Sequence, residues 1–466
     1  MGYVVPEGLT LRGYQSAAAA FLAARPRVIL GDAPGVGKTI TALVSLASRN
    51  IERILVVAPL SVVHRWEDEA ALWVPDYAIH VSTGSAARRH KVVTAATHST
   101  GPTILVTNYE AAKRDVELLR ALTPAALVID EAHRVKERRT KNFAAIKALS
   151  EEIPIFISVT GTPILNRPEE LWALLHLIDP KRWRSYWAWV DEFCEADVVQ
   201  HPGMTQPTKV VKGMRLGMDA VLRQQMRDVM IRRTLEELLP NLPKVTETTV
   251  TIDLSSHERK LYDQMRLFYF AESHDPGAGM AVIARNEVSK ITRLRQLAQD
   301  WSMLSIDAPD DARSSKLDAL REIVDDLDPE PVVIFSCFAK VIDRVARMLG
   351  CPKITGAVGP RDRRDVIRAF QAGTVRAIAG TVGTMAEGID LFRAHHVVFT
   401  DLDWVPARND QAVARVLRSG QQSDKVFVHR IVARNTVDQF IERKIRQKEA
   451  VINALVGSAW QEVVGT

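Results

Sequence analysis

The chain has 466 residues, of which 47% are hydrophobic and 25% are charged, as is typical of soluble globular proteins with two or three domains. A net charge of +5 permits a nucleic-acid partner without demonstrating one. The three cysteines lack the paired spacing of zinc sites, and their odd number argues against a disulfide framework. No stretch is apolar and long enough to cross a membrane, and the first residues lack a signal-peptide pattern. We therefore expect a cytoplasmic protein with no membrane partner.

The first predicted strand, residues 28–30, runs directly into the glycine-rich segment Gly-Asp-Ala-Pro-Gly-Val-Gly-Lys-Thr at 31–39. A loop of this kind between a strand and a helix is typical of nucleoside triphosphatases, because its backbone N–H groups face the phosphates. Lys38 would add a positive charge, and Thr39 would offer its hydroxyl to magnesium. The strict pattern has glycine where this chain has Asp32, so a chance glycine loop is the alternative.

A later predicted strand, residues 127–129, ends in an acidic segment that begins with Asp130 and Glu131. Carboxylates at the carboxyl end of a buried strand are suited to magnesium and to an attacking water. We expect Asp130 to hold the metal, directly or through water, and Glu131 to orient or deprotonate the nucleophile. A solvated acidic turn is the other interpretation, but the two motifs in this order indicate hydrolysis of a nucleoside triphosphate.

Strands and helices alternate in the first and last parts of the chain but not between them. The strands predicted at 28–30, 54–58, 104–107, 127–129 and 155–159 are nearly continuous apolar runs, as expected when helices cover both faces of a parallel sheet. From 167 to about 300 we expect helices at 169–178, 221–239, 258–270 and 280–299, with one strand at 245–253. A second parallel sheet is predicted from about residue 312, with strands at 332–335, 377–381, 397–400 and 426–430.

The second half has no glycine-lysine loop, but it has two arginines in the segment 411–418. Arg415 and Arg418 are three residues apart and are expected on one face of a helix. Arginines on a surface helix are commonly solvated or ion-paired. In a two-lobed nucleotidase they are also candidates for side chains that reach the γ-phosphate.

Two further groups of residues have a structural interpretation that we favour. Trp183, Trp187 and Trp189 could stack on bases, but three aromatics in a helical region more commonly form a core. His395 and His396 lie beside an apolar strand and lack the spacing of zinc ligands, so we expect them to be structural.

In order and type, these motifs resemble those of superfamily-two helicases and, within them, the Swi/Snf-type DNA translocases. The resemblance runs from residue 11 to about 448, and this family commonly has aspartate at the position of Asp32. Departures from the family pattern occur at 33–34, 414 and 417, and none removes a catalytic group. The matching segments are 11–15, 32–39, 59–63 with Trp66 and Glu69, 107–110, 160–163 with Asn166, 231–234 with Leu239 and Pro240, 294–296, 314–317, 388–390, Trp404 and 411–421.

The resemblance implies an α/β fold with two RecA-like parallel-sheet lobes in tandem and helical protrusions between them. The expected divisions are 1–166 for the ATP-binding lobe one and 167–243 for a helical protrusion and return segment of that lobe. Residues 244–311 would form a second helical protrusion that leads into lobe two, which would occupy 312–466.

The resemblance also implies ATP and Mg²⁺ as cofactors and assigns roles to individual residues. Catalysis falls to Lys38, Asp130, Glu131, Arg415 and Arg418, and the metal to Thr39 and Asp130. Nucleotide binding is expected of Gln15, Asp32, Gly35, Gly37, Lys38, Thr39, Gly388, Asp390 and Gln411. DNA contacts are expected of Ser61, Asn108, Lys136, Thr381 and Trp404, and coupling of hydrolysis to movement of His133, Thr160, Gly161 and Thr162.

The activity implied by the family is ATP-driven movement along double-stranded DNA without obligatory unwinding. The alternatives are a strand-separating DNA or RNA helicase and an ATP-gated DNA clamp. No histone-reading segment or zinc module is visible, which favours remodelling of forks, branched DNA or protein–DNA complexes in a bacterium or virus. We expect double-stranded or branched DNA as the partner, a monomer or weak oligomer, and a protein partner for targeting as an open option.

Overall fold

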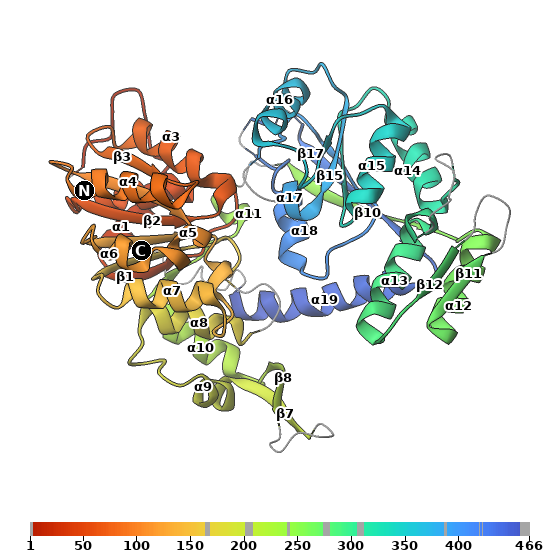
Figure 1. Ribbon diagram of the computed structural model, residues 1–466, viewed down its shortest axis with the longest axis horizontal. Helices are drawn as coiled ribbons and strands as arrows, with labels where there is room; N and C mark the ends of the chain where they lie inside the picture. The colour runs from red at the N-terminus through yellow and green to blue at the C-terminus, as the bar shows by residue number, and fades with distance from the viewer. Residues whose placement is uncertain are drawn as a thin grey trace. The chain divides into compact units, whose positions relative to one another are not determined.

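The structure is a computed structural model that describes residues 3–163, 168–200, 208–239, 243–273, 280–304, 312–385, 389–418, 420–421 and 423–456. The chain divides into two compact units, each with its own parallel sheet (Figure 1). Unit 1 contains Met1–Pro240 together with Lys448–Thr466, and unit 2 contains Asn241–Gln447. The predicted α/β class with two parallel-sheet lobes in tandem is confirmed.

The sheet of unit 1 has seven strands in the order β3-β4-β2-β5-β6-β1-β9, and every neighbouring pair is parallel. All five strands predicted in this part of the chain are present, together with β3 and β9. The strands are β1 (Arg27–Leu30), β2 (Arg53–Ala58), β3 (Ala78–Ser82), β4 (Thr103–Asn108), β5 (Ala126–Asp130), β6 (Ile155–Val159) and β9 (Met230–Ile231).

Successive residues of these strands enter two different hydrophobic cores, one on each face of the sheet. Ile29 and Leu55 pack into one core with Ile146 and Leu171, whereas Leu30 packs into the other. Helices α1, α2 and α3 supply the second core, and α5, α7 and α8 supply the first. Burial on both faces explains why the strands are almost wholly apolar.

The helices of unit 1 connect and cover this sheet (Figure 1). They are α1 (Gly13–Ala23), α2 (Lys38–Ala47), η1 (Leu60–Val62), α3 (Val63–Trp73), α4 (Ala86–Thr97), α5 (Tyr109–Arg114), α6 (Val116–Arg120), η2 (Ala132–Val135), α7 (Lys141–Ser150), α8 (Glu170–Ile178), α9 (Tyr186–Phe193), α10 (Met218–Met226) and α11 (Leu235–Leu238).

The part of unit 1 after residue 168 differs from the prediction of an all-helical region. The antiparallel hairpin of β7 (Cys194–Val199) and β8 (Thr208–Met214) projects from the unit (Figure 1). The single helix predicted at 221–239 is wrong, because α10 and α11 are separated by β9. Met230 and Ile231 leave the helical conformation because β1 offers their backbone a parallel partner.

The sheet of unit 2 has six strands in the order β10-β17-β16-β13-β15-β14, and every neighbouring pair is parallel. The prediction that this sheet begins near residue 312 is wrong. The earlier strand β10 pairs with β17 over its full length, from Lys244↔Lys425 to Ile252↔Ala433. The strands are β10 (Lys244–Ile252), β13 (Val332–Ser336), β14 (Lys353–Ile354), β15 (Ala377–Thr381), β16 (His396–Phe399) and β17 (Lys425–Ala433).

A helix predicted at 280–299 begins seven residues later than expected. Residues 280–283 form β12 (Met280–Ile283), which pairs with β11 (Phe270–Ser273), and Asn286 then caps α13 with a capping box.

The helices of unit 2 are α12 (Ser256–Phe268), α13 (Glu287–Gln299), η3 (Trp301–Leu304), α14 (Ser315–Asp326), α15 (Ala339–Leu349), α16 (Pro360–Gln371), α17 (Val382–Met385), α18 (Pro406–Val413) and α19 (Val437–Val456). Helix α19 continues beyond the unit boundary at 447.

The structure agrees with most of the predictions that the tryptophans form a core and that the histidine pair is structural. Trp183 and Trp189 are buried in the unit 1 core, whereas Trp187 is 42% exposed. His396 stacks between neighbours on β17, with its ring centroid 5.0 Å from that of Phe427 and 5.5 Å from that of His429. Within the described residues, no helix has the length and apolarity needed to span a membrane.

Candidate nucleotide-binding site

The glycine-rich segment forms a tight loop between β1 and α2. Gly35 and Gly37 have φ angles of 87° and 81°, a conformation that favours glycine because it has no Cβ. Lys38 is the first residue of α2, and its Nζ donates hydrogen bonds of 2.9 Å to the backbone oxygens of both Asp32 and Ala33. The loop therefore curves around the lysine at the N-terminus of a helix, the arrangement that suits phosphate groups.

Two arginines that follow β9 support this loop. The Arg233 guanidinium makes a bidentate pair with the Asp32 carboxylate, through Nε at 3.1 Å and Nη2 at 2.5 Å, and the Asp32 side chain is only 3% exposed. Arg232 donates to the backbone oxygens of Gly31 and Gly161 at 3.3 and 3.2 Å. The sequence identified this arginine pair as a family segment but gave it no role, since a partner about 200 residues away leaves no local signal.

Gln15 on α1 contacts the loop from another side. Its Nε2 donates to the backbone oxygen of Val36 at 3.1 Å, and its Oε1 accepts the backbone N–H of Arg12 at 2.9 Å. A Cβ on Gly37 would collide with the Gln15 amide. The structure thus brings the predicted glutamine against the phosphate loop, where it fixes one wall.

The predicted acidic pair lies at the carboxyl end of β5, in the same unit. Asp130 accepts hydrogen bonds from the Trp66 indole N–H at 2.8 Å and from the backbone N–H of Glu131 at 2.8 Å. Glu131 has a φ of 48°, which is uncommon outside glycine and turns the chain sharply at this point. The Tyr109 hydroxyl donates to the backbone oxygen of Asp130 at 2.7 Å. The conformation of the acidic turn is therefore held by three neighbouring groups.

The electrostatics of Asp130 distinguish it from a solvated carboxylate. Burial raises the pKa of Asp130 above its usual range, and the nearby Glu131 carboxylate raises it further. The Trp66 hydrogen bond and the positive charge of Lys38 act in the opposite direction. A carboxyl that is desolvated beside a second carboxyl gains from a cation, and this pattern is frequent at functional sites.

The donor set near the loop fits a magnesium ion. Thr39 in the first turn of α2 and Asp130 supply hydroxyl and carboxylate oxygens, the ligand type that Mg²⁺ prefers. Within the described ranges, no group of three or more His, Cys, Asp and Glu side chains converges as a metal cage. This is compatible with Mg²⁺, which commonly takes its other ligands from water and substrate phosphates.

The residues predicted to couple hydrolysis to movement lie beside this site. His133 Nδ1 is 3.1 Å from Glu131 Oε2. The backbone N–H of Thr160 donates to the oxygen of Leu30 at 3.0 Å, at the point where β1 enters the phosphate loop. A Cβ on Gly161 would come within 2.9 Å of the Pro34 ring. The Thr160 hydroxyl accepts the backbone N–H of Thr162 at 3.1 Å, so this segment packs directly on the loop.

The three predicted DNA contacts of unit 1 have different surroundings. Ser61 lies exposed on η1. Asn108 is buried and caps α5, because its side-chain oxygen accepts the backbone N–H of Ala111 at 3.0 Å. Lys136 pairs with Glu170 on α8 at 2.7 Å. Asn108 and Lys136 therefore have a structural partner inside the unit.

In unit 2 the two predicted arginines do not share a helix, and that prediction is wrong. Helix α18 ends at Val413, and Arg415 and Arg418 lie in the turns that follow. Beyond Val413 the backbone N–H groups of Arg415 and Val416 bond to oxygens only three residues back, and the backbone oxygen of Arg415 accepts the N–H of Leu391 at 2.8 Å. Both side chains are buried, which also excludes the solvated surface position.

Of the nucleotide-binding residues predicted in unit 2, Asp390 is close to one of these arginines. Arg418 Nε is 3.2 Å from Asp390 Oδ1, an ion pair in which Arg418 is 8% exposed and Asp390 is 43% exposed. Gln411 is buried on α18. Gly388 lies outside the described residues.

The two DNA contacts predicted in unit 2 have different surroundings. The Thr381 hydroxyl, at the end of β15, donates to that of Thr384 at 2.8 Å. Trp404 packs edge-on against Phe440, with ring centroids 6.0 Å apart, and the Arg295 guanidinium lies 5.8 Å from the Trp404 ring. Arg295 also pairs with Asp401 at 2.9 Å, so the Leu-Arg-Gln segment of α13 holds the loop after β16.

Comparison with known families gives two matches along the chain. Residues 14–303, more than half of the chain, match the family described as the SNF2-related domain, and residues 315–420 match the helicase conserved C-terminal domain. The two matches meet between 303 and 315, whereas the compact units divide at Pro240.

Individual relatives are similar over almost the whole chain. The CHD3-type chromatin-remodeling factor CHR7 of Arabidopsis thaliana is 26% identical over 493 residues, which cover 97% of this chain and 38% of that protein. Bacillus subtilis YwqA, described as a candidate ATP-dependent helicase/translocase, is 26% identical over 450 residues, which cover 92% of this chain and 46% of that protein. This chain therefore spans less than half the length of these relatives.

A solved structure described as the Sulfolobus solfataricus SWI2/SNF2 ATPase core in complex with dsDNA is also similar. It is 23% identical, with a TM-score of 0.44, and the alignment covers 99% of this chain and 96% of that chain.

Proposed function

This chain belongs to the SNF2-related family of helicase-like ATPases, and on that premise we propose that it is a DNA-dependent ATPase that translocates on double-stranded DNA. The enzyme class expected from the sequence, a helicase-like ATPase, agrees with both family matches. ATP is the substrate in this proposal, and Mg²⁺ is its cofactor.

One observation carries the proposal: the glycine loop and the acidic turn occupy the carboxyl ends of strands in one sheet. β1 leads into the loop around Lys38, and β5 leads into Asp130 and Glu131. Open α/β sheets bind ligands at this edge. The charge of Lys38 is close enough to influence the pKa of Asp130, so the cationic and acidic groups face a common region.

We assign each of these side chains a role in the proposed reaction. Lys38 and the N-terminus of α2 neutralise the β- and γ-phosphates of ATP. Mg²⁺ held by Thr39 and Asp130 supplies further charge neutralisation when it is bound. Glu131 accepts a proton from the attacking water or orients it, and His133 at 3.1 Å positions that carboxylate. Arg415 and Arg418 act on the transferred phosphoryl group in this proposal.

The DNA contacts assigned to Ser61, Asn108, Lys136, Thr381 and Trp404 stay proposals. The relatives support a DNA partner through their descriptions as a chromatin-remodeling factor and a candidate translocase. We propose remodelling of forks, branched DNA or protein–DNA complexes as the task, in the cytoplasm of a bacterium or of a virus-infected cell. We also propose that the protein is a monomer or a weakly associating oligomer, and that a protein partner recruits it to its target.

The first experiment measures ATP hydrolysis with blunt duplex, forked DNA, single-stranded DNA and RNA. We expect strong stimulation by duplex or forked DNA and a steep loss of stimulation with salt, because phosphate contacts release counterions. The sequence of the duplex should have little effect, since phosphate contacts carry no sequence information. Stimulation by RNA alone would contradict the proposal and favour an RNA helicase.

The second experiment compares third-strand displacement from a triplex with strand separation of a partial duplex. A translocase that does not unwind DNA should use ATP to displace the third strand and leave the duplex paired. Efficient separation of a long duplex without triplex displacement would support a strand-separating helicase instead. ATP binding that tightens DNA binding without turnover would identify an ATP-gated clamp.

A further inference from the structure

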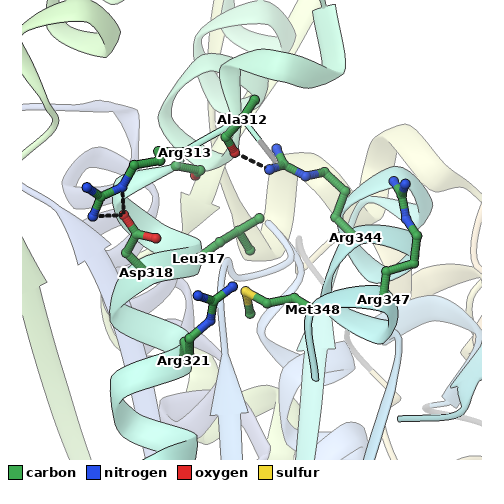
Figure 2. Close-up of a pocket in the computed structure, with 9 residues that line it drawn as sticks. Ala312, Arg313, Leu317, Asp318, Arg321, Arg344, Arg347 and Met348 are labelled. Atoms are coloured by element: carbon green, nitrogen blue, oxygen red, sulfur yellow. Dashed lines mark hydrogen bonds and ion pairs between the residues drawn. The ribbon is translucent and has the colours of Figure 1, made fainter. Parts of the chain in front are cut away.

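Unit 2 contains a pocket of about 630 Å³ that is remote in sequence from the residues assigned to ATP or DNA. It lies between α14 and α15, with the short segment before α14 at its rim (Figure 2). Four of its lining residues are arginines: Arg313, Arg321, Arg344 and Arg347. A concave site of this volume is within the range of small-molecule pockets.

The positive charge of the pocket exceeds the negative charge that lines it. Arg313 pairs with Asp318 at 3.1 Å, and Asp318 is the only acidic lining residue that the structure describes (Figure 2). Arg344 pairs with the buried Asp300 at 2.5 Å. Arg321 makes no hydrogen bond or ion pair with any described residue, although it shares α14 with Asp318. Arg321 therefore adds a positive charge that no described carboxylate neutralises.

The spacing of the arginines concentrates their charge on one region. Arg344 and Arg347 are three residues apart on α15 and so lie on the same face of that helix, opposite α14. Like charges that line one pocket repel each other, and a multivalent anion relieves that repulsion by charge-assisted hydrogen bonds. Their planar fork matches phosphate oxygens in a bidentate manner.

Part of the wall between the arginines is apolar. Leu317 is buried, and Met348 is half-buried across the pocket on α15 (Figure 2). Methionine is unbranched and adapts to irregular ligand surfaces. Arginines beside a small apolar wall suit a ligand that combines phosphates with a less polar part.

We propose that this pocket binds a small polyphosphate anion of the nucleoside di- or triphosphate type. Arg321 and Arg347 contact the phosphates, while Leu317 and Met348 contact the less polar part. The site is distinct from the ATP site of unit 1, since all of its lining residues belong to unit 2. A phosphate backbone of DNA has the same chemistry, but a concave pocket of this size favours the small ligand.

The test uses inorganic tripolyphosphate as the probe and the full chain with Lys38→Ala, in which the phosphate loop has lost its lysine. Isothermal titration calorimetry compares this protein with a version that also carries Arg321→Glu and Arg347→Glu. The matched control carries Arg361→Glu and Arg364→Glu, which reverse two exposed arginines three residues apart on α16 of the same unit. We expect at least roughly tenfold weaker binding in the pocket variant and little change in the control.

A second measurement locates the probe on the unmodified chain. Phenylglyoxal modifies accessible arginines, and mass spectrometry reports each site. Tripolyphosphate should protect Arg321 and Arg347 but not Arg361 and Arg364. This readout does not depend on any variant folding correctly, and thermal unfolding of each variant checks the calorimetry.

Three outcomes would overturn the proposal. Equal weakening in the pocket and control variants would indicate diffuse attraction, and absence of protection at Arg321 and Arg347 would place the probe elsewhere. A short duplex that protects these arginines when tripolyphosphate does not would identify a contact with the DNA backbone. The DNA-stimulated ATPase rate is measured separately, so failure of this proposal is distinguishable from failure of the proposed function.

Discussion

The charged groups at the carboxyl edges of the two sheets differ in how their signs are arranged. In unit 1, Lys38 and Glu131 are half-buried, and burial raises the pKa of Asp130. In unit 2, the corresponding edge is held by the Arg295–Asp401 pair, and below it Lys316 pairs with Asp438 at 2.6 Å while being completely buried. Unit 1 thus places two carboxyl groups side by side, an arrangement that gains from a cation, whereas unit 2 uses opposite charges to hold its own loops. Arg418 lies between these cases, since it is buried and paired with the more exposed Asp390.

The largest expected effect is at the candidate nucleotide-binding site of unit 1. Glu131→Gln should lower ATP turnover on the order of ten-thousandfold, because the group that accepts the proton or orients the water is lost. ATP binding should persist, since Lys38 and Asp130 remain. Single-turnover kinetics and nucleotide binding measure the two effects. Near-normal turnover would show that Glu131 is not the base.

A variant of Arg418 tests whether unit 2 also contributes to ATP hydrolysis. Arg418→Ala should lower kcat on the order of a thousandfold with little change in KM, as for other arginines that stabilise a phosphoryl-transfer transition state. Steady-state kinetics and thermal unfolding are measured together. A lower unfolding temperature with unchanged kcat would mean that the pair with Asp390 is only structural.

Lys316 tests the structural side of the comparison. Lys316→Ala removes the partner of the buried Asp438 and two further hydrogen bonds, to Gln299 and Thr400. Unit 2 should lose about 3 kcal/mol of stability, as when one member of a buried ion pair is removed. Hydrogen exchange followed by mass spectrometry should show faster exchange in β13 and β17 but not in β1. Lys353→Ala, which breaks an exposed pair in the same unit, is the control and should cost less than about 1 kcal/mol.

Arg233 tests whether the phosphate loop depends on a support from outside the motif. Arg233→Ala leaves Asp32 buried without its partner and should raise KM for ATP roughly tenfold, with a smaller change in kcat. Arg233→Lys keeps the charge but loses the bidentate geometry, so it should restore part of the affinity. If both variants had the wild-type KM, the loop would hold its shape through its backbone contacts alone.

The smallest effect is a pH dependence of unit 2. Burial, with the neighbouring His395 and His429, lowers the pKa of His396 from 6.5 to about 4. The folded state therefore binds fewer protons than the unfolded state in this window, so stability is complete above 6.5 and falls as the pH drops toward 4. The slope is at most about 1.4 kcal/mol per pH unit. Denaturation by urea between pH 7 and 5 should show this slope, and His396→Phe should reduce it.

The parts of the fold that were predicted correctly depend on local patterns. β1, β5 and the loops after them combine apolar runs with glycine, lysine and carboxylates over a few residues, and the positive φ angles of Gly35 and Gly37 follow from residue type. The sequence therefore predicted the residues that the structure brings together at the candidate site of unit 1. It did not predict the roles of Trp66 and Arg233, because each depends on a partner far along the chain.

The sequence by itself determined the α/β class, the order of the motifs and the chemistry of the phosphate loop and acidic turn, since these follow from periodicity and from adjacent residue types. Only the tertiary structure decided that β10 belongs to the second sheet, that β9 interrupts a predicted helix and that Arg415 and Arg418 lie beyond the end of α18. The physical reason is the same in each case. A backbone group forms its hydrogen bond with whichever partner the fold brings near, and the partners of β10, β9 and Arg415 lie in distant segments of the chain.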